Sequence, residues 1–294
     1  MSRKFFQGKH WFFEETEKLG IPASPAWGVL PEREIYSGRS AYQEIEIFEA
    51  EGYGCILALD GVVQLSTQHG CVYHEMLVHP AAFYHDDPRR VFIIGGGDGG
   101  ALREITKHPV EEILLVDIDE AVIEVSKTHL LSVSMGAFDD PRVTLITEDA
   151  VDVIRRYQRR FDLIISDSTD AYGPSKALWA DSFYRLVGEA LDDDGIACFQ
   201  TGYFTDAFAR KERKRIKERF LFSTVHRAHV GCFPFDEYTF TVVSKKIDFS
   251  RITVEHIQEK FRASGITTQY YSPEIHFASA VIPKYFGEPQ AFCR

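Results

Sequence analysis

Acidic side chains follow four apolar segments of the sequence, each at the point where the segment ends. Asp98 lies within a glycine-rich run at Gly95–Gly100, and single carboxylates follow the next two segments at Asp117 and Asp149. The fourth segment runs into Asp167-Ser-Thr-Asp170. Like charges crowded at one rim destabilise a folded chain unless cations neutralise them. The sequence therefore predicts a cleft for a ligand that carries several positive charges.

The glycine-rich run suggests a nucleoside in that ligand. It has the pattern G-x-G-x-x-G through Gly95, Gly97 and Gly100, which by itself reports only a tight turn that a ligand can approach. Asp117 follows about 20 residues later, where a carboxylate can accept hydrogen bonds from both ribose hydroxyls. The alternative is that Asp117 caps the next helix. Asp98 would repel a pyrophosphate, so the loop favours an adenosyl sulfonium over a nicotinamide dinucleotide.

These residues are expected on an α/β fold. From about residue 88, short apolar runs alternate with amphipathic helical patterns. Such alternation predicts a Rossmann-like parallel sheet with helices on both faces, and this kind of sheet binds its ligand beyond the carboxyl ends of the strands. Strands are expected at 91–94, 113–116, 143–146, 162–165, 196–199 and 239–243, and helices at 101–107, 120–127, 151–157, 178–191 and 253–264.

The first 70 residues have a different pattern. Residues 42–48 alternate between the two faces of a strand, and two apolar runs between residues 54 and 65 are separated by Asp60-Gly61. That dipeptide between apolar runs is a hairpin signal. We therefore predict an N-terminal antiparallel β-sheet domain over residues 1–70 and a Rossmann-like catalytic domain over residues 71–294.

Composition and charge exclude several classes of protein. The chain has 294 residues, is 45% hydrophobic and carries a net charge of -11, which indicates a folded protein rather than a disordered one. Nucleic acids and anionic membranes need a positive footprint, so neither is expected as a partner. Glutamates interrupt the basic segment 210–219, which is predicted to be a solvated helix face. No run approaches the roughly 20 apolar residues of a membrane span, and no signal-peptide pattern is apparent.

The cysteines and histidines carry no sign of metal or disulfide chemistry. No two cysteines lie at C-x-x-C spacing, and several lie in apolar runs, which is typical of free thiols in a reducing cytoplasm. His226, His229 and His276 lack metal-ligand spacing, so structural or surface roles and no metal site are expected. The five cysteines are Cys55, Cys71, Cys198, Cys232 and Cys293.

Taken together, the motifs resemble those of the spermidine synthase family of polyamine aminopropyltransferases. The resemblance runs from about residue 11 to about residue 245. It rests on Leu59-Asp-Gly-Val-Val-Gln64, Tyr73-His-Glu-Met76, the run Gly95–Gly100, Val116-Asp-Ile-Asp119, and Asp167-Ser-Thr-Asp170 followed by Gly173-Pro174. Any one of these motifs alone would be weak, whereas the combination is specific.

The resemblance implies a sheet of the S-adenosylmethionine-dependent methyltransferase type and an aminopropyl transfer. The donor would be decarboxylated S-adenosylmethionine, used as a co-substrate with no permanently bound cofactor and no metal. The acceptor would be a di- or polyamine, putrescine first, and methylthioadenosine would leave. The family also implies a homodimer or homotetramer.

Carried over by position, the resemblance assigns roles to individual residues. Asp167 matches the general base that takes the proton of the acceptor amine, and Asp98 and Asp170 match carboxylates that hold amine groups. On the donor side the matched residues are Gln43, Gln64, Gly95, Gly97, Asp98, Asp117 and Asp149, with Asp149 at the adenine. On the amine side they are Tyr73, His74, Asp98, Asp170 and Gln200.

The acceptor half matches the family less closely than the donor half. Ala171 replaces the usual proline, and Phe233 stands at a usual tyrosine, which predicts one hydroxyl fewer near the acceptor. Asp236 and Glu237 are expected to be solvated turn residues, the alternative being extra carboxylates in the site. Agmatine and spermidine therefore stay open as acceptors beside putrescine.

Two other classes share the expected sheet. A small-molecule S-adenosylmethionine methyltransferase would use the same adenosine groups, but the methionine carboxylate would require hydrogen-bond donors where Asp98 and Asp170 stand. A non-catalytic polyamine or nucleoside binder would bind methylthioadenosine without turnover. The presence of Asp167 disfavours that second class.

Overall fold

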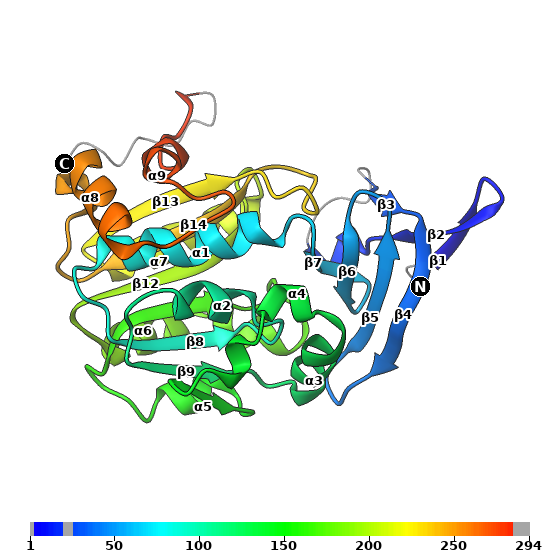
Figure 1. Ribbon diagram of the computed structural model, residues 1–294, viewed down its shortest axis with the longest axis horizontal. Coiled ribbons are helices and arrows are strands. Elements are labelled where there is room, and N and C mark those ends of the chain that lie inside the picture. The colour runs from blue at the N-terminus through cyan, green and yellow to red at the C-terminus, as the bar shows by residue number, and fades with distance from the viewer. Residues whose placement is uncertain (1–2, 20–25, 285–294) are drawn as a thin grey trace.

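The molecule divides along its long axis into an α/β body and a group of N-terminal strands (Figure 1). The structure is a computed structural model and describes residues 3–19 and 26–284. The predicted α/β class is confirmed, with a mostly parallel central sheet and antiparallel N-terminal strands. No helix within these described residues is long and apolar enough to cross a membrane.

The central sheet has seven strands in the order β10-β9-β8-β11-β12-β14-β13. The first five are parallel, and β14 and β13 are antiparallel to their neighbours. The strands are β8 (Arg90–Gly95), β9 (Glu112–Val116), β10 (Val143–Ile146), β11 (Phe161–Asp167), β12 (Leu191–Tyr203), β13 (Phe222–Ala228) and β14 (Tyr238–Ser244). All six predicted strands are present. The sequence prediction missed β13, because polar residues such as Thr224 and His226 are buried there by tertiary contacts that no local pattern reveals.

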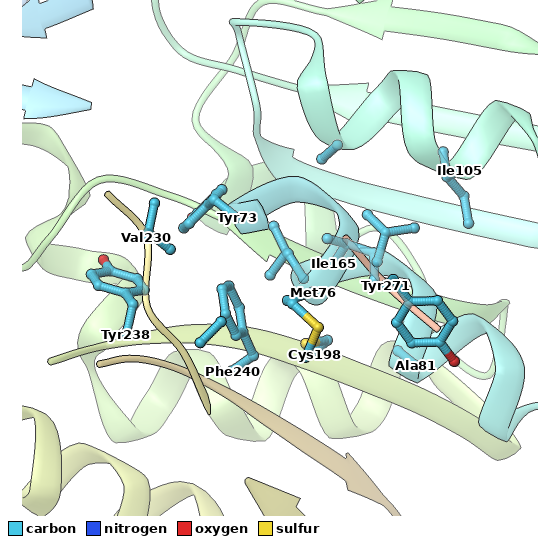
Figure 2. Packing of buried hydrophobic residues seen from close by; sticks show 14 of the residues in the cluster. Tyr73, Met76, Ala81, Ile105, Ile165, Cys198, Val230, Tyr238, Phe240 and Tyr271 are labelled. Carbon is cyan, nitrogen blue, oxygen red and sulfur yellow. The ribbon is translucent and has the colours of Figure 1, made fainter. Parts of the chain in front are cut away.

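Helices cover both faces of this sheet, as predicted. Consecutive strand residues alternate between two cores: Ile93 packs with α1 and α2, and Ile94 packs with α5, α6 and α7. Figure 2 shows Met76 of α1 close to Cys198 and Ile165 of the sheet within the first core. The helices are α1 (Gly70–Tyr84), α2 (Gly100–Thr106), α3 (Glu120–His129), α4 (Leu131–Ser134), α5 (Ala150–Ile154), α6 (Asp181–Ala190), α7 (Ala207–Arg219), α8 (Val254–Ser264) and α9 (Pro273–Ser279), with 3₁₀ helices η1 (Thr16–Leu19), η2 (Ala137–Asp139), η3 (Gly173–Trp179) and η4 (Phe249–Arg251).

The N-terminal strands form two antiparallel sheets rather than the single one expected. One contains β1 (Arg3–Phe6), β2 (Lys9–Phe13) and β3 (Gly28–Val29), and the other β4 (Pro31–Arg39), β5 (Glu44–Ala50), β6 (Gly54–Leu59) and β7 (Val62–Ser66). The predicted hairpin joins β6 to β7, and Asp60 and Gly61 have φ values of 50° and 76° there. Ile45 and Ile47 of β5 pack against Val122 of α3, which seats the second sheet beside the strand ends.

Three further predictions are tested by the fold. Cys55, Cys71, Cys198 and Cys232 are free thiols, and Cys293 lies outside the described residues. His226 is buried and bonded to Ser279, a structural role. The basic helix α7 is largely exposed as expected, but the solvated-face interpretation is wrong for Glu212 and Arg213, which are buried against the sheet.

Candidate active site

A cavity opens at the carboxyl ends of the parallel strands, where the strand order reverses between β8 and β11. Ligands of open α/β sheets bind at this kind of switch point. The cavity is lined by all five of the predicted rim carboxylates, Asp98, Asp117, Asp149, Asp167 and Asp170, and by Gln43, Gln64, Tyr73, Gly95 and Gly97. The strand-end prediction therefore brought together residues that are close in space.

The glycines of the loop are required by close packing between strand ends. Gly95 has a φ of 75°, and a side-chain carbon there would lie 2.3 Å from the carbonyl oxygen of Asp167. At Gly100 the same atom would lie 2.1 Å from the ring of His74. The close packing also allows a backbone hydrogen bond, in which the Gly96 N–H donates to the Asp167 carbonyl at 3.0 Å. The loop is thus pressed against β11 and α1, and any side chain at these positions would separate them.

Asp117 faces the cavity and does not cap the next helix. Asp119 is the N-cap of α3, since its carboxylate accepts the Ala121 N–H. The Asp117 carboxylate accepts instead from the N–H groups of Gly97 and Asp119, both at 2.9 Å. Burial raises the pKa of Asp117 to about 6 against the opposing effect of these hydrogen bonds. Asp119 has a second task, because it also accepts from Gln43 Nε2 at 2.9 Å and so fixes that amide at the cavity wall.

The other donor-side residues have mixed roles. Asp149 is exposed and caps α5 through the Val151 N–H at 2.8 Å, while it also lines the cavity. Gln64 donates to the Val62 carbonyl and to the hydroxyl of Tyr172 at 3.0 Å. Tyr172 therefore links the segment after β11 to strand β7.

Asp98 forms a buried ion pair with His74. The distance from His74 Nε2 to Asp98 Oδ2 is 3.1 Å, and the Gly100 N–H donates to Asp98 Oδ1 at 2.7 Å. Burial opposes both charges, but the pair and the backbone hydrogen bond outweigh it, so the pKa of His74 is raised and that of Asp98 lowered. His74 itself does not line the cavity, and it can act on a ligand only through Asp98.

The two carboxylate oxygens of Asp167, a cavity-lining residue, differ in their hydrogen bonding. Its Oδ1 accepts from the hydroxyl of Tyr73 at 2.8 Å, while its Oδ2 is buried without a hydrogen-bond partner. Burial first, and the nearby charge of Asp98 second, raise the pKa of Asp167 to about 7. His74, Asp98 and Asp167 hold potential metal-ligand atoms within 4.8 Å of one another. The His74 and Asp98 side chains of this group are already joined by a hydrogen bond.

Asp170 is held by a tyrosine that the sequence analysis did not single out. The single hydroxyl proton of Tyr238 is shared between two acceptors, Gln200 Oε1 at 2.7 Å and Asp170 Oδ1 at 3.2 Å. The rings of Tyr238 and Phe233 are 4.9 Å apart. Gln200, like His74, does not line the cavity and lies behind Tyr238.

Glu14 is the main residue that the sequence analysis missed. It lines the same cavity from the N-terminal region; its Oε1 accepts the Val63 N–H at 3.0 Å and its Oε2 is buried without a partner. Burial raises the pKa of Glu14 to about 8. Tyr203 and Tyr238 also line the cavity and were not singled out from the sequence. No local motif marks Glu14, because only the fold brings it to the strand ends.

Comparison with known proteins settles the family. A sequence model of the spermine/spermidine synthase domain matches residues 70–254, and one of the spermidine synthase tetramerisation domain matches residues 31–67. The chain belongs to the spermidine synthase family. This family uses decarboxylated S-adenosylmethionine as its aminopropyl donor, and its enzymes are polyamine aminopropyltransferases, so that resemblance is confirmed.

Individual relatives in the spermidine synthase family cover nearly the whole chain. The polyamine aminopropyltransferase of Thermoanaerobacter sp. (strain X514) is 39% identical over 250 residues, which are 84% of this chain and 88% of that protein. That of Bacillus subtilis (strain 168) is 36% identical over 282 residues, 95% of this chain and 98% of that one. A crystal structure of a spermidine synthase in complex with the transition state analogue AdoDATO has a TM-score of 0.87 at 35% identity, covering 94% of this chain and 92% of that chain. The match to the tetramerisation domain indicates an oligomer.

Proposed function

We propose that this protein transfers the aminopropyl group of decarboxylated S-adenosylmethionine to putrescine, forming spermidine and releasing methylthioadenosine. The choice of a diamine rests on two buried carboxylate oxygens that have no hydrogen-bond partner. Among the carboxylates of residues 3–19 and 26–284, only Glu14 Oε2 and Asp167 Oδ2 are fully buried without a hydrogen-bond partner. Both residues line one cavity, and buried polar atoms require partners. A short diamine supplies two nitrogens for two such oxygens.

The donor would be held by the side of the cavity formed by β8, β9 and β10. Asp117 would accept from the ribose hydroxyls and Asp149 from the adenine amino group, with Gln43 and Gln64 beside the thioadenosine. Asp98, kept ionised by His74, would bind the propylamine. These contacts would place the carbon next to sulfur at the mouth of the acceptor end, where alignment supplies most of the rate gain.

Asp167 would then act as the general base. Its Oδ2 accepts a proton from the acceptor nitrogen, whose lone pair attacks the carbon next to sulfur. The carbon–sulfur bond breaks, its electron pair neutralises the sulfonium, and methylthioadenosine leaves. Tyr73 occupies Oδ1, which leaves Oδ2 as the oxygen without a partner. Asp170, held by Tyr238, would bind the amine beside it.

The class of reaction is tested with the purified protein and a panel of amines. We expect methylthioadenosine and spermidine from decarboxylated S-adenosylmethionine with putrescine, and slower turnover with agmatine or spermidine as acceptor. Intact S-adenosylmethionine should be a poor donor, because its carboxylate would lie near Asp98. Faster turnover with agmatine or spermidine would reassign the acceptor. Methyl transfer from the intact donor would contradict the reaction itself.

Glu14→Gln should raise the KM for putrescine by about 10- to 100-fold, the range expected when a charge-assisted contact is lost. The change keeps the shape of the side chain and the Val63 hydrogen bond but removes the carboxyl group, which a bound distal ammonium would hold in its ionised form. Steady-state kinetics with putrescine and with n-butylamine, which lacks that ammonium, measure the effect. The preference for the diamine should shrink in the variant.

The matched control for Glu14→Gln is Glu17→Gln, three positions on and exposed. It should leave the KM values for putrescine and for n-butylamine unchanged. A Glu14→Gln protein that keeps the full preference for putrescine would show that the distal ammonium binds elsewhere.

The pH dependence should report the raised pKa of Asp167. A general base must be ionised, so with the donor saturating and n-butylamine, which does not use Glu14, far below saturation, kcat/KM for the amine should rise with pH up to about pH 7 and then level off. An ordinary aspartate would give a flat profile down to about pH 4. The measurement is the rate of methylthioadenosine formation from pH 5 to pH 9. A flat profile between pH 5 and pH 7 would contradict the assignment.

We further propose that the oligomer is a homodimer or homotetramer formed through the N-terminal sheet of β4 to β7, the region that the tetramerisation domain matches. Light scattering of the purified chain distinguishes the two states. A monomer at micromolar concentration would contradict both.

A further inference from the structure

The acceptor end of the cavity is built on a β-bulge. Strands β12 and β14 pair regularly as far as Gln200 opposite Phe240, after which Tyr203 stands opposite Tyr238. Thr201 and Gly202 together therefore face the single residue between Phe240 and Tyr238, which is the definition of a bulge. Gly202 has a φ of 66°, a conformation that favours glycine.

The extra residue changes which side chains reach the cavity. Side chains alternate along a regular strand, so Gln200 and Tyr203 would point to opposite faces of the sheet. The bulge brings both to the face of Tyr238. There Tyr203 lines the cavity with its ring 5.5 Å from that of Tyr238, and Gln200 accepts the Tyr238 hydroxyl. Two tyrosine rings and the amide thus meet beside Asp170.

A buried guanidinium holds the bulge from the opposite face of the sheet. Arg213 of α7 is 1% exposed. It donates to the carbonyl oxygens of Tyr203 and Phe204, to that of Thr201 at 3.5 Å, and to Thr239 Oγ1 at 3.3 Å. Thr239 in turn donates to the Gly202 carbonyl at 2.7 Å. Carbonyls released from the strand ladder need other donors when buried, and the rigid fork of an arginine can serve several at once.

We infer that Arg213 is a positioning residue for amine selection, acting through the bulge that places Tyr203 in the cavity wall and Gln200 behind Tyr238. This inference rests on the proposed function. The aromatic faces of Tyr203 and Tyr238 attract an ammonium and its methylene chain, and their separation depends on the bulge. The donor groups stand on β8, β9 and β10, away from α7. Loosening the bulge should therefore weaken amine binding and selectivity and leave nucleoside binding intact.

The test compares Arg213→Lys and Thr239→Val with Arg215→Lys, a control on the same helix whose arginine is 39% exposed and paired with Glu212. Lysine keeps the charge but loses the fork, and valine removes the hydroxyl that joins Arg213 to Gly202. For both variants we expect a KM for putrescine raised about tenfold, a smaller preference for putrescine over agmatine, and a Kd for methylthioadenosine within about twofold of the unaltered protein. Arg215→Lys should change none of these.

The outcomes separate the alternatives. If both Arg213→Lys and Thr239→Val fold and bind methylthioadenosine normally with unchanged KM and unchanged preference, the inference is overturned. An equal loss of methylthioadenosine and putrescine binding would also overturn it, by showing a general structural role. Should Arg213→Lys fail to fold, Thr239→Val alone decides by the same criteria. Failure of the unaltered protein to transfer aminopropyl groups to any amine would instead refute the proposed function.

Discussion

Replacing Asp167 with asparagine should lower kcat by a factor of about 10²–10⁴, the usual worth of a positioned general base. Asparagine has the same shape and can still accept the Tyr73 hydroxyl on its oxygen. Its amide nitrogen, however, cannot take a proton from the amine. At a thousandfold loss this corresponds to about 4 kcal/mol of transition-state stabilisation. Initial rates of methylthioadenosine release at saturating substrates measure the effect.

Two controls accompany Asp167→Asn. Methylthioadenosine should bind with an affinity within a few-fold of the unaltered protein, because the carboxylate is assigned to proton transfer rather than to the nucleoside. Asp152→Asn, a change at an exposed aspartate paired with Arg155, should be fully active. If Asp167→Asn retained more than about a tenth of the rate, the proton would have to leave by another route, and Asp167 would no longer be the base.

Asp98→Asn should raise the KM for decarboxylated S-adenosylmethionine by about 100-fold while leaving the Kd for methylthioadenosine nearly unchanged. The two ligands differ by the aminopropyl group and its charge. Asparagine can keep the hydrogen bond from the Gly100 N–H but offers no charge to the propylamine. A buried charge pair that loses one member costs several kcal/mol, so the effect should be large. Steady-state kinetics measure the KM for the donor, and calorimetry measures the Kd of each ligand.

The behaviour of His74 provides a check on the Asp98 prediction. His74 does not line the cavity, and its contact with the site is the 3.1 Å hydrogen bond to Asp98. His74→Gln can still donate a hydrogen bond to the Asp98 carboxylate. It should therefore weaken the binding of decarboxylated S-adenosylmethionine less than Asp98→Asn does. If Asp98→Asn weakened the binding of methylthioadenosine as much as the binding of decarboxylated S-adenosylmethionine, Asp98 would serve to shape the loop rather than to bind the amine.

Local sequence was sufficient for much of the site. Apolar runs such as 91–94 and 113–116 predicted parallel strands because residues buried on both faces of a sheet must be apolar in succession. Carboxyl ends of such strands share one edge, so the order of the chain placed Asp98, Asp117 and Asp167 together before any contact was known. Asp60-Gly61 predicted its hairpin because two positive φ values suit that dipeptide.

Tertiary packing decided what those carboxylates can do. Whether Asp117 or Asp119 caps α3, and that His74 and Gln200 stand behind the cavity rather than in it, depend on contacts between segments far apart in the chain. The same holds for Arg213, buried in a helix whose composition indicates exposure. A strand or turn can be predicted from the preferences of neighbouring residues, whereas contacts between distant segments cannot.

The acceptor end shows the division most clearly. The sequence alone determined that carboxylates follow the strands, because strand ends are set by local pattern. Only the tertiary structure placed Glu14 opposite them and turned Tyr203 and Tyr238 inward. These residues come from the N-terminal region, a bulge and an antiparallel strand, and their orientation depends on side-chain packing across the whole molecule, which no short segment encodes.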